Sequence, residues 1–325
     1  MISRYVALAG LVTFSAPLWA QPATTKVDTV SGVPQIDKTS QTQDIRLRTD
    51  RDDRMTVPIH LSGAGPYQFL VDTGADRTAV SRELVGRLAL PSAGKVELHS
   101  ISGVSEINTA RVRDVQLTRQ AHTIEAAVLD GANMGADGIV GADLLRSERV
   151  EFDFEKQTMT VVPSTTPDFR NEGETIVVRA WRKNGRLVVT DAEIGGERVT
   201  VVLDTGSDIS MGNEALRRRA ETGAIVDLRD AVELQSVTGA KIMGDVMSIR
   251  QMTIGGIQLN NLSVVITDAH TFKQLGLRDR PALLLGMNAM RAFKKVSIDF
   301  ANKKFRVVMP EHSQLETQVA SRGGH

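Results

Sequence analysis

The stretch Phe69-Leu70-Val71-Asp72-Thr73-Gly74-Ala75-Asp76 occurs twice, with small changes, in this chain of 325 residues. Its second copy reads Val201-Val202-Leu203-Asp204-Thr205-Gly206-Ser207-Asp208 and lies 132 residues later, since 204 − 72 = 132. In both copies three apolar residues run directly into Asp-Thr-Gly, a pattern that predicts a buried strand ending at the aspartate. A carboxylate at the end of a buried strand is costly unless it is hydrogen-bonded or functional. Asp72 and Asp204 are therefore the first candidates for a functional site.

Three more pairs of segments match in the same order along the chain, which indicates an internal duplication. Their offsets are 136, 145 and 146 residues, from 236 − 100, 286 − 141 and 296 − 150. The offset only grows, as expected when the second copy has gained loop residues. These additions fall near residues 217–230 and 270–281, which are polar and are expected to be surface loops. The matched segments are Ser100–Gly103 with Ser236–Gly239, Gly138–Gly141 with Leu283–Gly286, and Val150–Phe154 with Val296–Phe300.

The duplication and the composition around it predict the domain organisation. The first repeat is expected over residues 45–163 and the second over 175–309, joined by a linker at 164–174 that contains proline, asparagine and glycine. Residues 21–44 are rich in Thr, Ser, Gln and Asp and indicate a flexible leader. The polar tail at 310–325 is predicted to be disordered.

Residues 1–20 have the pattern of a signal peptide. Arg4 is followed by an apolar run from Tyr5 to Leu18, and the small residue Ala20 marks the expected cleavage site. An uncleaved membrane anchor is the alternative, although the run is shorter than the roughly 20 residues of a spanning helix. The chain contains no cysteine, which excludes disulfides and thiol chemistry. An exported chain without disulfides is most simply placed in a bacterial periplasm.

The overall charge and the missing motifs exclude several classes of function. There are 39 basic and 39 acidic residues, so the net charge of zero argues against nucleic-acid binding. The six histidines do not have metal-ligand spacing. Neither a Gly-x-Ser-x-Gly nucleophile motif nor a phosphate-binding Gly-Lys-Ser/Thr loop occurs. We therefore expect no metal, no cofactor and no nucleic-acid partner.

The local pattern within both repeats is mostly that of β-strands. Residues 55–61 and 67–71 are expected to flank a turn, and Gly195-Gly196 predicts a hairpin turn before the second Asp-Thr-Gly. Short helices are expected at 81–88, 142–146, 214–221 and 287–293.

The residues after each aspartate suggest how two such loops would work together. The hydroxyls of Thr73 and Thr205 could bond backbone groups across a pseudo-two-fold axis. Gly74 and Gly206 allow a tight turn and bring a backbone N–H close to the carboxylate. Two loops that face each other would place two carboxyls in contact, and a pair that close shares one proton. One carboxyl could then act as a base on water while the other donates to a carbonyl oxygen.

Taken together, these motifs resemble the retropepsin-like aspartic peptidases, with two such units in tandem. The resemblance implies a mainly β fold of two acid-protease β-barrel repeats with pseudo-two-fold symmetry and an active site between them. It also implies that an extended peptide binds as an added strand and is hydrolysed by water activated between Asp72 and Asp204, without a metal. Gly141 and Gly286 match the glycine that supports the catalytic turn. The residues that match the substrate-covering flaps are Ile101, Ser102, Gly103, Val237, Thr238 and Gly239.

The sequence departs from the family pattern in two places. Retroviral members carry an arginine after the supporting glycine, whereas this chain has Ala142 and Met287, so Asp76 and Asp208 are expected to lack that partner. Pepsins carry a tyrosine in their flap, and neither tyrosine of this chain lies in one. A fused retropepsin pair is therefore the better comparison.

Several alternatives remain open from the sequence. The chain is expected to act as a monomeric aspartic endopeptidase on polypeptide substrate, and the alternative is a peptide-binding module without turnover. The repeats could also pair between chains. Asp76 and Asp208 either bind substrate backbone or fix their own turns. The Ser207 hydroxyl, absent at Ala75, is hypothesised to make Asp204 the more acidic carboxyl.

Overall fold

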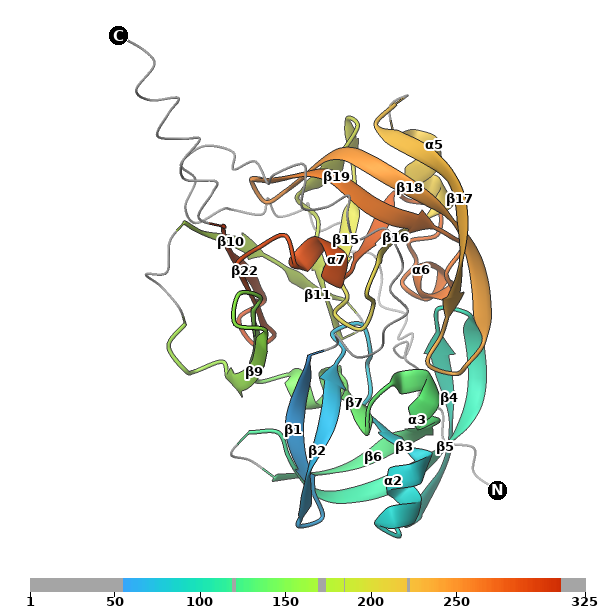
Figure 1. Cartoon of the computed structure of the whole chain (residues 1–325), viewed down its shortest axis with the longest axis vertical. Helices are drawn as coiled ribbons and strands as arrows, with labels where there is room; N and C mark the ends of the chain where they lie inside the picture. Colours follow the sequence, from blue (N-terminus) through green and yellow to red (C-terminus); the bar gives the residue numbers. More distant parts are fainter. Residues whose placement is uncertain (1–54, 119–120, 169–173, 184, 221–222, 311–325) are drawn as a thin grey trace, which may run out of the picture.

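The computed structural model describes residues 55–118, 121–168, 174–183, 185–220 and 223–310. The expected signal peptide, leader and tail beyond residue 310 lie outside these ranges. Within them, every helix is too short or too polar to span a bilayer. Strands dominate, which confirms the predicted mainly β class (Figure 1).

The first repeat forms a sheet of seven strands in the order β1-β2-β7-β3-β6-β5-β4. β1 also pairs with β5 through His60 and Gln116, so the sheet curls back on itself. Its strands are β1 (Thr56–Leu61), β2 (Ala64–Val71), β3 (Ala79–Ser81), β4 (Ser92–Ser100), β5 (Gly103–Gln116), β6 (Ala121–Leu129) and β7 (Gly138–Val140). Its helices are α2 (Arg82–Arg87), α3 (Gly131–Met134) and α4 (Ala142–Leu145).

The second repeat has the same strand order, since β12-β15-β20-β16-β19-β18-β17 follows the path of β1-β2-β7-β3-β6-β5-β4. A duplicated sequence therefore folds into a duplicated topology. Its strands are β11 (Trp181–Lys183), β12 (Arg186–Val189), β13 (Ala192–Ile194), β14 (Glu197–Arg198), β15 (Thr200–Leu203), β16 (Ser210–Gly212), β17 (Ile225–Gln235), β18 (Lys241–Ile254), β19 (Ile257–Ile266) and β20 (Ala282–Leu285). Its helices are α5 (Glu214–Arg219), α6 (His270–Gln274) and α7 (Met287–Met290).

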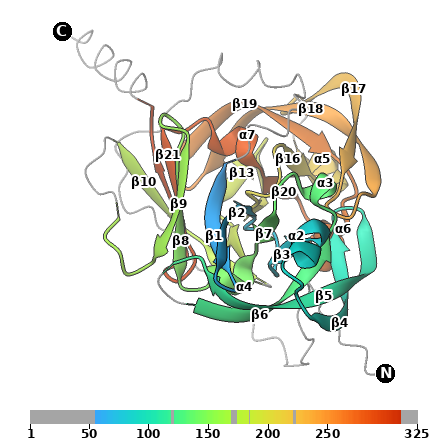
Figure 2. The same cartoon turned by 60° about the horizontal axis from the view of Figure 1, so that its bottom comes forward.

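A third sheet joins the two repeats in the order β10-β22-β21-β8-β9. β8 and β21 contain the matched segments Val150–Phe154 and Val296–Phe300 except for the final phenylalanines, and they pair with each other, for example Val150 with Ile298. In both views this sheet lies at one side of the molecule, and the β4–β5 and β17–β18 hairpins lie at the other (Figures 1 and 2). The bounds are β8 (Glu148–Asp153), β9 (Thr158–Pro163), β10 (Thr175–Arg179), β21 (Lys295–Asp299) and β22 (Lys304–Val308).

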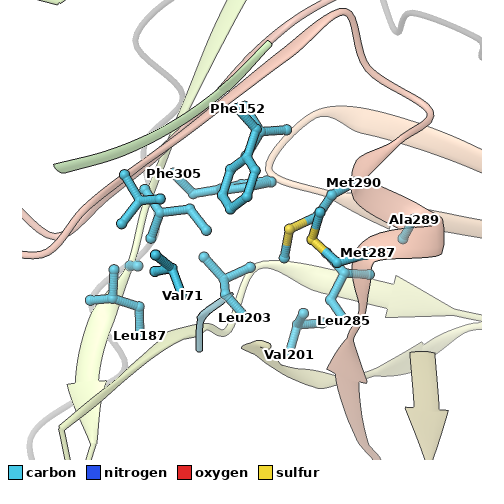
Figure 3. Close-up of a cluster of buried hydrophobic side chains, with 14 of the residues drawn as sticks. Val71, Phe152, Leu187, Val201, Leu203, Leu285, Met287, Ala289, Met290 and Phe305 are labelled. Carbon is cyan, nitrogen blue, oxygen red and sulfur yellow. The ribbon is translucent and has the colours of Figure 1, made fainter. Parts of the chain in front are cut away.

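The main hydrophobic core runs through both repeats and the third sheet. Val71 and Leu203, the residues before the two aspartates, are both buried in it. They lie near Phe152 and Phe305 of the third sheet, as Figure 3 shows. Burying a side chain of this size stabilises the fold by about 1.5–3 kcal/mol. The two Asp-Thr-Gly loops are thus anchored in one shared core.

The segments that the sequence marked as surface loops are partly structured. Within residues 270–281, Phe272, Leu275 and Leu277 are buried against Val188 and other core residues, so the expectation of a surface loop there is wrong. Polar neighbours such as Lys273, Gln274 and Arg278 make this segment look exposed in the sequence. Within residues 217–230, α5 ends at Arg219 and the long strand β17 begins at Ile225.

Candidate active site

The two Asp-Thr-Gly loops meet and exchange hydrogen bonds. The Thr73 hydroxyl donates to the Leu203 carbonyl at 2.8 Å, and the Thr205 hydroxyl donates to the Val71 carbonyl at 2.6 Å. Each threonine hydroxyl also accepts the backbone N–H of the other threonine, at 3.1 Å in both directions. Each loop therefore needs the other to satisfy its backbone groups, as the sequence suggested for these hydroxyls.

The two glycines bring the carboxyls of Asp72 and Asp204 together. The N–H of Gly74 donates to Asp72 Oδ1 at 2.7 Å, and that of Gly206 donates to Asp204 Oδ1 at 3.1 Å. A Cβ atom added to Gly206 would lie 2.2 Å from Asp72 Cγ, and one added to Gly74 would lie 2.7 Å from Asp204 Oδ1. Each glycine therefore packs against the carboxyl of the other repeat, where only hydrogen fits.

The environment of this pair favours a retained proton. Burial raises the pKa of Asp204 to about 7, and the nearby Asp72 carboxyl adds to the rise through its charge and a side-chain hydrogen bond. Arg186 and the Gly206 N–H act in the opposite direction. Two carboxyls this close titrate as a pair, so the proton belongs to both.

Asp76 pairs with an arginine other than the one that follows the supporting glycine in retroviral members. Arg186, at the start of β12 in the second repeat, lies 3.5 Å from Asp76 through Nη1 and Oδ1. Its Nε donates to the Gly74 carbonyl at 2.6 Å, within the Asp-Thr-Gly loop of the first repeat. Arg186 is only 2 % exposed, so the contact is an internal one.

Arg186 limits the rise in the pKa of Asp76. Burial raises the pKa of Asp76 to about 6, the arginine charge lowers it, and the charges of Asp72 and Asp143 raise it. A buried arginine held by a carboxylate and a backbone carbonyl fixes the turn after Gly74. The sequence did carry a signal for it, because Arg54 of the first repeat precedes Arg186 by the offset of the two Asp-Thr-Gly copies, 186 − 54 = 132. Arg54 lies outside the described residues.

The two supporting glycines, Gly141 and Gly286, lie against the turns that follow the Asp-Thr-Gly tripeptides, as the resemblance implied. A Cβ at Gly141 would lie 2.4 Å from the backbone of Arg77, and one at Gly286 would lie 2.6 Å from that of Ile209. The next residues continue the contact, since Ala142 N–H donates to Ala75 and Met287 N–H donates to Ser207, both at 2.8 Å.

Two polar residues that the sequence analysis did not single out, Asp143 and Asn288, bind the segments that follow these loops. Asp143 accepts hydrogen bonds from the backbone and hydroxyl of Thr78, and Asn288 accepts the same two bonds from Ser210. Both pairs keep the repeat offsets, 288 − 143 = 145 and 210 − 78 = 132. Burial raises the pKa of Asp143, while its bonds to Thr78 and the Arg77 charge lower it.

Ser207 does not act on Asp204 as hypothesised. Its hydroxyl donates to the Ile209 carbonyl at 2.7 Å, within its own turn. The hypothesis that this hydroxyl makes Asp204 the more acidic carboxyl is therefore wrong.

The residues assigned to the flaps lie at the tips of two long hairpins. Ile101 and Ser102 connect β4 to β5, which begins at Gly103. Val237, Thr238 and Gly239 lie in the turn between β17 and β18. The two tips touch, because Ser102 donates to Ser236 at 3.1 Å.

Each tip also packs on the opposite repeat. Ile101 of the first flap contacts the cluster around Phe272 and Leu275 in the second repeat. Val237 of the second flap contacts the cluster around Leu70 and Met134 in the first. Figure 1 shows β4 beside α6 and the β17–β18 hairpin reaching toward α3.

Comparison with known families agrees with this geometry. The family described as "gag-polyprotein putative aspartyl protease" matches residues 57–147, and the family described as "Aspartyl protease" matches residues 190–289. Each match contains one Asp-Thr-Gly loop. No curated protein matches the sequence significantly. The two matches, on two repeats of one topology, place the chain in the retropepsin-like aspartyl protease family, as a tandem of two such domains.

Proposed function

We propose that the chain is an aspartic endopeptidase that hydrolyses peptide bonds of extended polypeptides with water activated between Asp72 and Asp204. The observation that supports this most is the pairing of the two carboxyls inside a frame of reciprocal threonine hydrogen bonds. A frame of this kind holds two groups in fixed orientation, which is what acid–base catalysis at one bond requires.

The chemistry follows from one proton shared between two carboxyls. The ionised member removes a proton from water as the water oxygen attacks the peptide carbonyl carbon. The protonated member donates its proton to the carbonyl oxygen, which becomes the hydroxyl of a tetrahedral intermediate. The carboxyl that took the water proton then donates it to the amide nitrogen, and the C–N bond breaks. A hydroxyl of the intermediate returns its proton to the other carboxyl as the product carboxyl group forms, which restores the shared proton. The raised pKa of Asp204 keeps that proton available up to about neutral pH.

The flaps define the shape of the proposed substrate. Their tips meet through Ser102 and Ser236, so we expect a chain that lies between the tips and the two aspartates to be extended and narrow. Strand edges in the hairpins offer backbone groups to which an extended peptide can add. A folded protein would have to present a loop or an unfolded segment.

We also propose that one chain suffices and that it acts after export. Both carboxyls of the pair come from one chain, which supports a monomer with intramolecular pairing of its repeats. The predicted signal peptide and the absence of cysteine support a periplasmic location.

The test separates turnover from binding. Wild-type protein is incubated with an unfolded, reduced polypeptide, and products are identified by mass spectrometry. We expect internal cleavage in the wild type and in the surface control Asp279→Asn, and none in the Asp72→Asn/Asp204→Asn double variant. Extended peptides that bind equally to all three proteins without any products would favour the peptide-binding module.

A further inference from the structure

The first flap is fastened to the second repeat by a pair of histidines. His99, near the end of β4, has its Nδ1 atom 2.8 Å from Nε2 of His270, the first residue of α6. The rings stack, with centroids 5.1 Å apart and planes 17° apart. The backbone N–H of His270 also donates to the Ile101 carbonyl at the flap tip, at 2.9 Å.

The second flap is fastened differently. Gln235, at the end of β17, donates from its side-chain amide to Asn133 Oδ1 in α3 at 2.9 Å. Gly239 lies against the same asparagine, since an added Cβ would meet Asn133 Nδ2 at 2.8 Å. Besides the Ser102–Ser236 bond between the two tips, each flap thus has a side-chain hydrogen bond to a helix of the opposite repeat. An amide pair does not titrate near neutral pH, whereas a histidine pair does.

We propose that the His99–His270 pair is a pH-sensitive clasp that holds the first flap closed at neutral pH and releases it in mild acid. The second flap, held by Gln235 and Asn133, stays in place. The inference concerns regulation of the proposed peptidase site and therefore rests on the function proposed above. The release of the flap depends on the contact between the two histidines and does not require catalysis.

The hydrogen bond needs an unprotonated ring nitrogen as acceptor. When both rings are protonated, each has only donors, and two positive charges face each other across 2.8 Å. The contact then changes from attraction to repulsion. The backbone bond at Ile101 lies next to the same contact and is expected to break with it.

The surrounding charges set the direction of this effect. Burial lowers the pKa of His99; the charges of His270 and Arg186 lower it further, while Glu97 on β4 raises it. Burial also lowers the pKa of His270, and Lys273 on α6 adds to that. Both rings are therefore harder to protonate in the docked flap than in a free one.

Release of the flap takes up protons, so docking is strongest above the ordinary histidine pKa of about 6.5 and weakens as the pH falls below it. Each proton taken up changes the ratio of open to closed flap by up to about tenfold per pH unit. Only the first flap carries this dependence.

The chain has no cysteine, so pairs of spin labels can be attached at introduced cysteines alone. Val104→Cys, exposed on β5, with Asp279→Cys, beyond α6, reports the first flap. Met243→Cys on β18 with Ala132→Cys on α3 reports the second. Pulsed EPR measures the distances from pH 8 to pH 5. The Asp204→Asn background removes titration of the catalytic pair and any self-cleavage.

We expect the first label pair to gain a longer, broader distance population as the pH falls to 5, while the second pair does not change. His270→Asn or His99→Gln should abolish the pH dependence of the first pair. An unchanged first distance, equal opening of both flaps, or persistence of the pH response in both histidine variants would overturn the proposal. Because the measurement uses an inactivated protein, failure of the peptidase proposal would not alter its outcome.

Discussion

Thr73 and Thr205 form a reciprocal pair in which each hydroxyl accepts the backbone N–H of the other residue and donates to a carbonyl of the opposite repeat. The arrangement joins the two repeats at the point where their carboxyls meet. It also makes each loop structurally dependent on the other. Changes at one threonine should therefore be felt in both repeats.

Replacing Thr73 with valine keeps its shape and removes its hydroxyl. The Leu203 carbonyl and the Thr205 N–H would each lose a hydrogen-bond partner. A buried polar group left without a partner costs about 1–3 kcal/mol, so we expect a free energy of unfolding lower by at least that amount. Thr73→Ser keeps the hydroxyl and serves as the control. Urea unfolding measures both, and a valine variant no less stable than the serine variant would contradict the role of these bonds.

Removing Arg186 should change both stability and pH dependence. Arg186→Met leaves Asp76 without its cation, and breaking a buried ion pair costs about 3–5 kcal/mol. The arginine charge lowers the pKa of Asp76 and Asp204, so its loss raises both.

The pH–rate profile checks whether loss of Arg186 raises the pKa of the catalytic pair. The alkaline limb of activity, where the catalytic pair loses its shared proton, should move to higher pH in Arg186→Met. Arg186→Lys keeps the charge and should move the limb much less. Identical limbs in the wild type and Arg186→Met would show that the arginine does not act on the pair.

How far the sequence predicts this structure depends on the range of the interactions. Strand, turn and motif order are local properties, so the repeated Asp-Thr-Gly segments predicted the fold class and the facing loops. The pairing of Val150 with Ile298 in the third sheet is also consistent with the matched segments, because both repeats contribute the same strand.

Contacts between repeats were harder to predict. Arg186 reaches Asp76 across 110 residues of sequence, since 186 − 76 = 110, and only its match to Arg54 hinted at a role. His99 and His270 are 171 residues apart, so no spacing rule connects them. Ser207 could have turned toward Asp204 or toward its own turn, and only the folded backbone decides between the two.

Gly206 should not tolerate even one added methyl group. Its Cβ would lie 2.2 Å from Asp72 Cγ, so Gly206→Ala must push the two carboxyls apart. We expect a loss of activity of at least about a hundredfold, the lower range for loss of acid–base catalysis. Gly86→Ala in α2 meets nothing within 4 Å and should keep activity while adding up to about 1 kcal/mol of stability. Similar activity of the two variants would contradict the proposed contact.

The raised pKa of Asp204 predicts a pH-dependent stability. The folded protein holds this proton up to about pH 7, whereas the unfolded chain releases it near the ordinary value of 3.8. The wild type therefore loses stability at this site as the pH rises between those values.

Asp204→Asn isolates the effect because the amide resembles the protonated acid in shape and charge. Relative to the wild type, the variant should gain stability as the pH rises from 4 to 8. Chemical unfolding at several pH values measures the difference. A difference that does not vary with pH would show that Asp204 titrates normally.

The proposed function requires that Asp72 and Asp204 form one catalytic pair within a single chain. It is tested most directly by the cleavage rate of an unfolded polypeptide with the wild type, with Asp72→Asn, with Asp204→Asn, and with an equal mixture of the two variants. Each variant should lose at least about a thousandfold in rate, within the range for loss of acid–base catalysis, and the mixture should stay equally inactive. Substantial activity in either single variant, or recovery in the mixture, would contradict the claim.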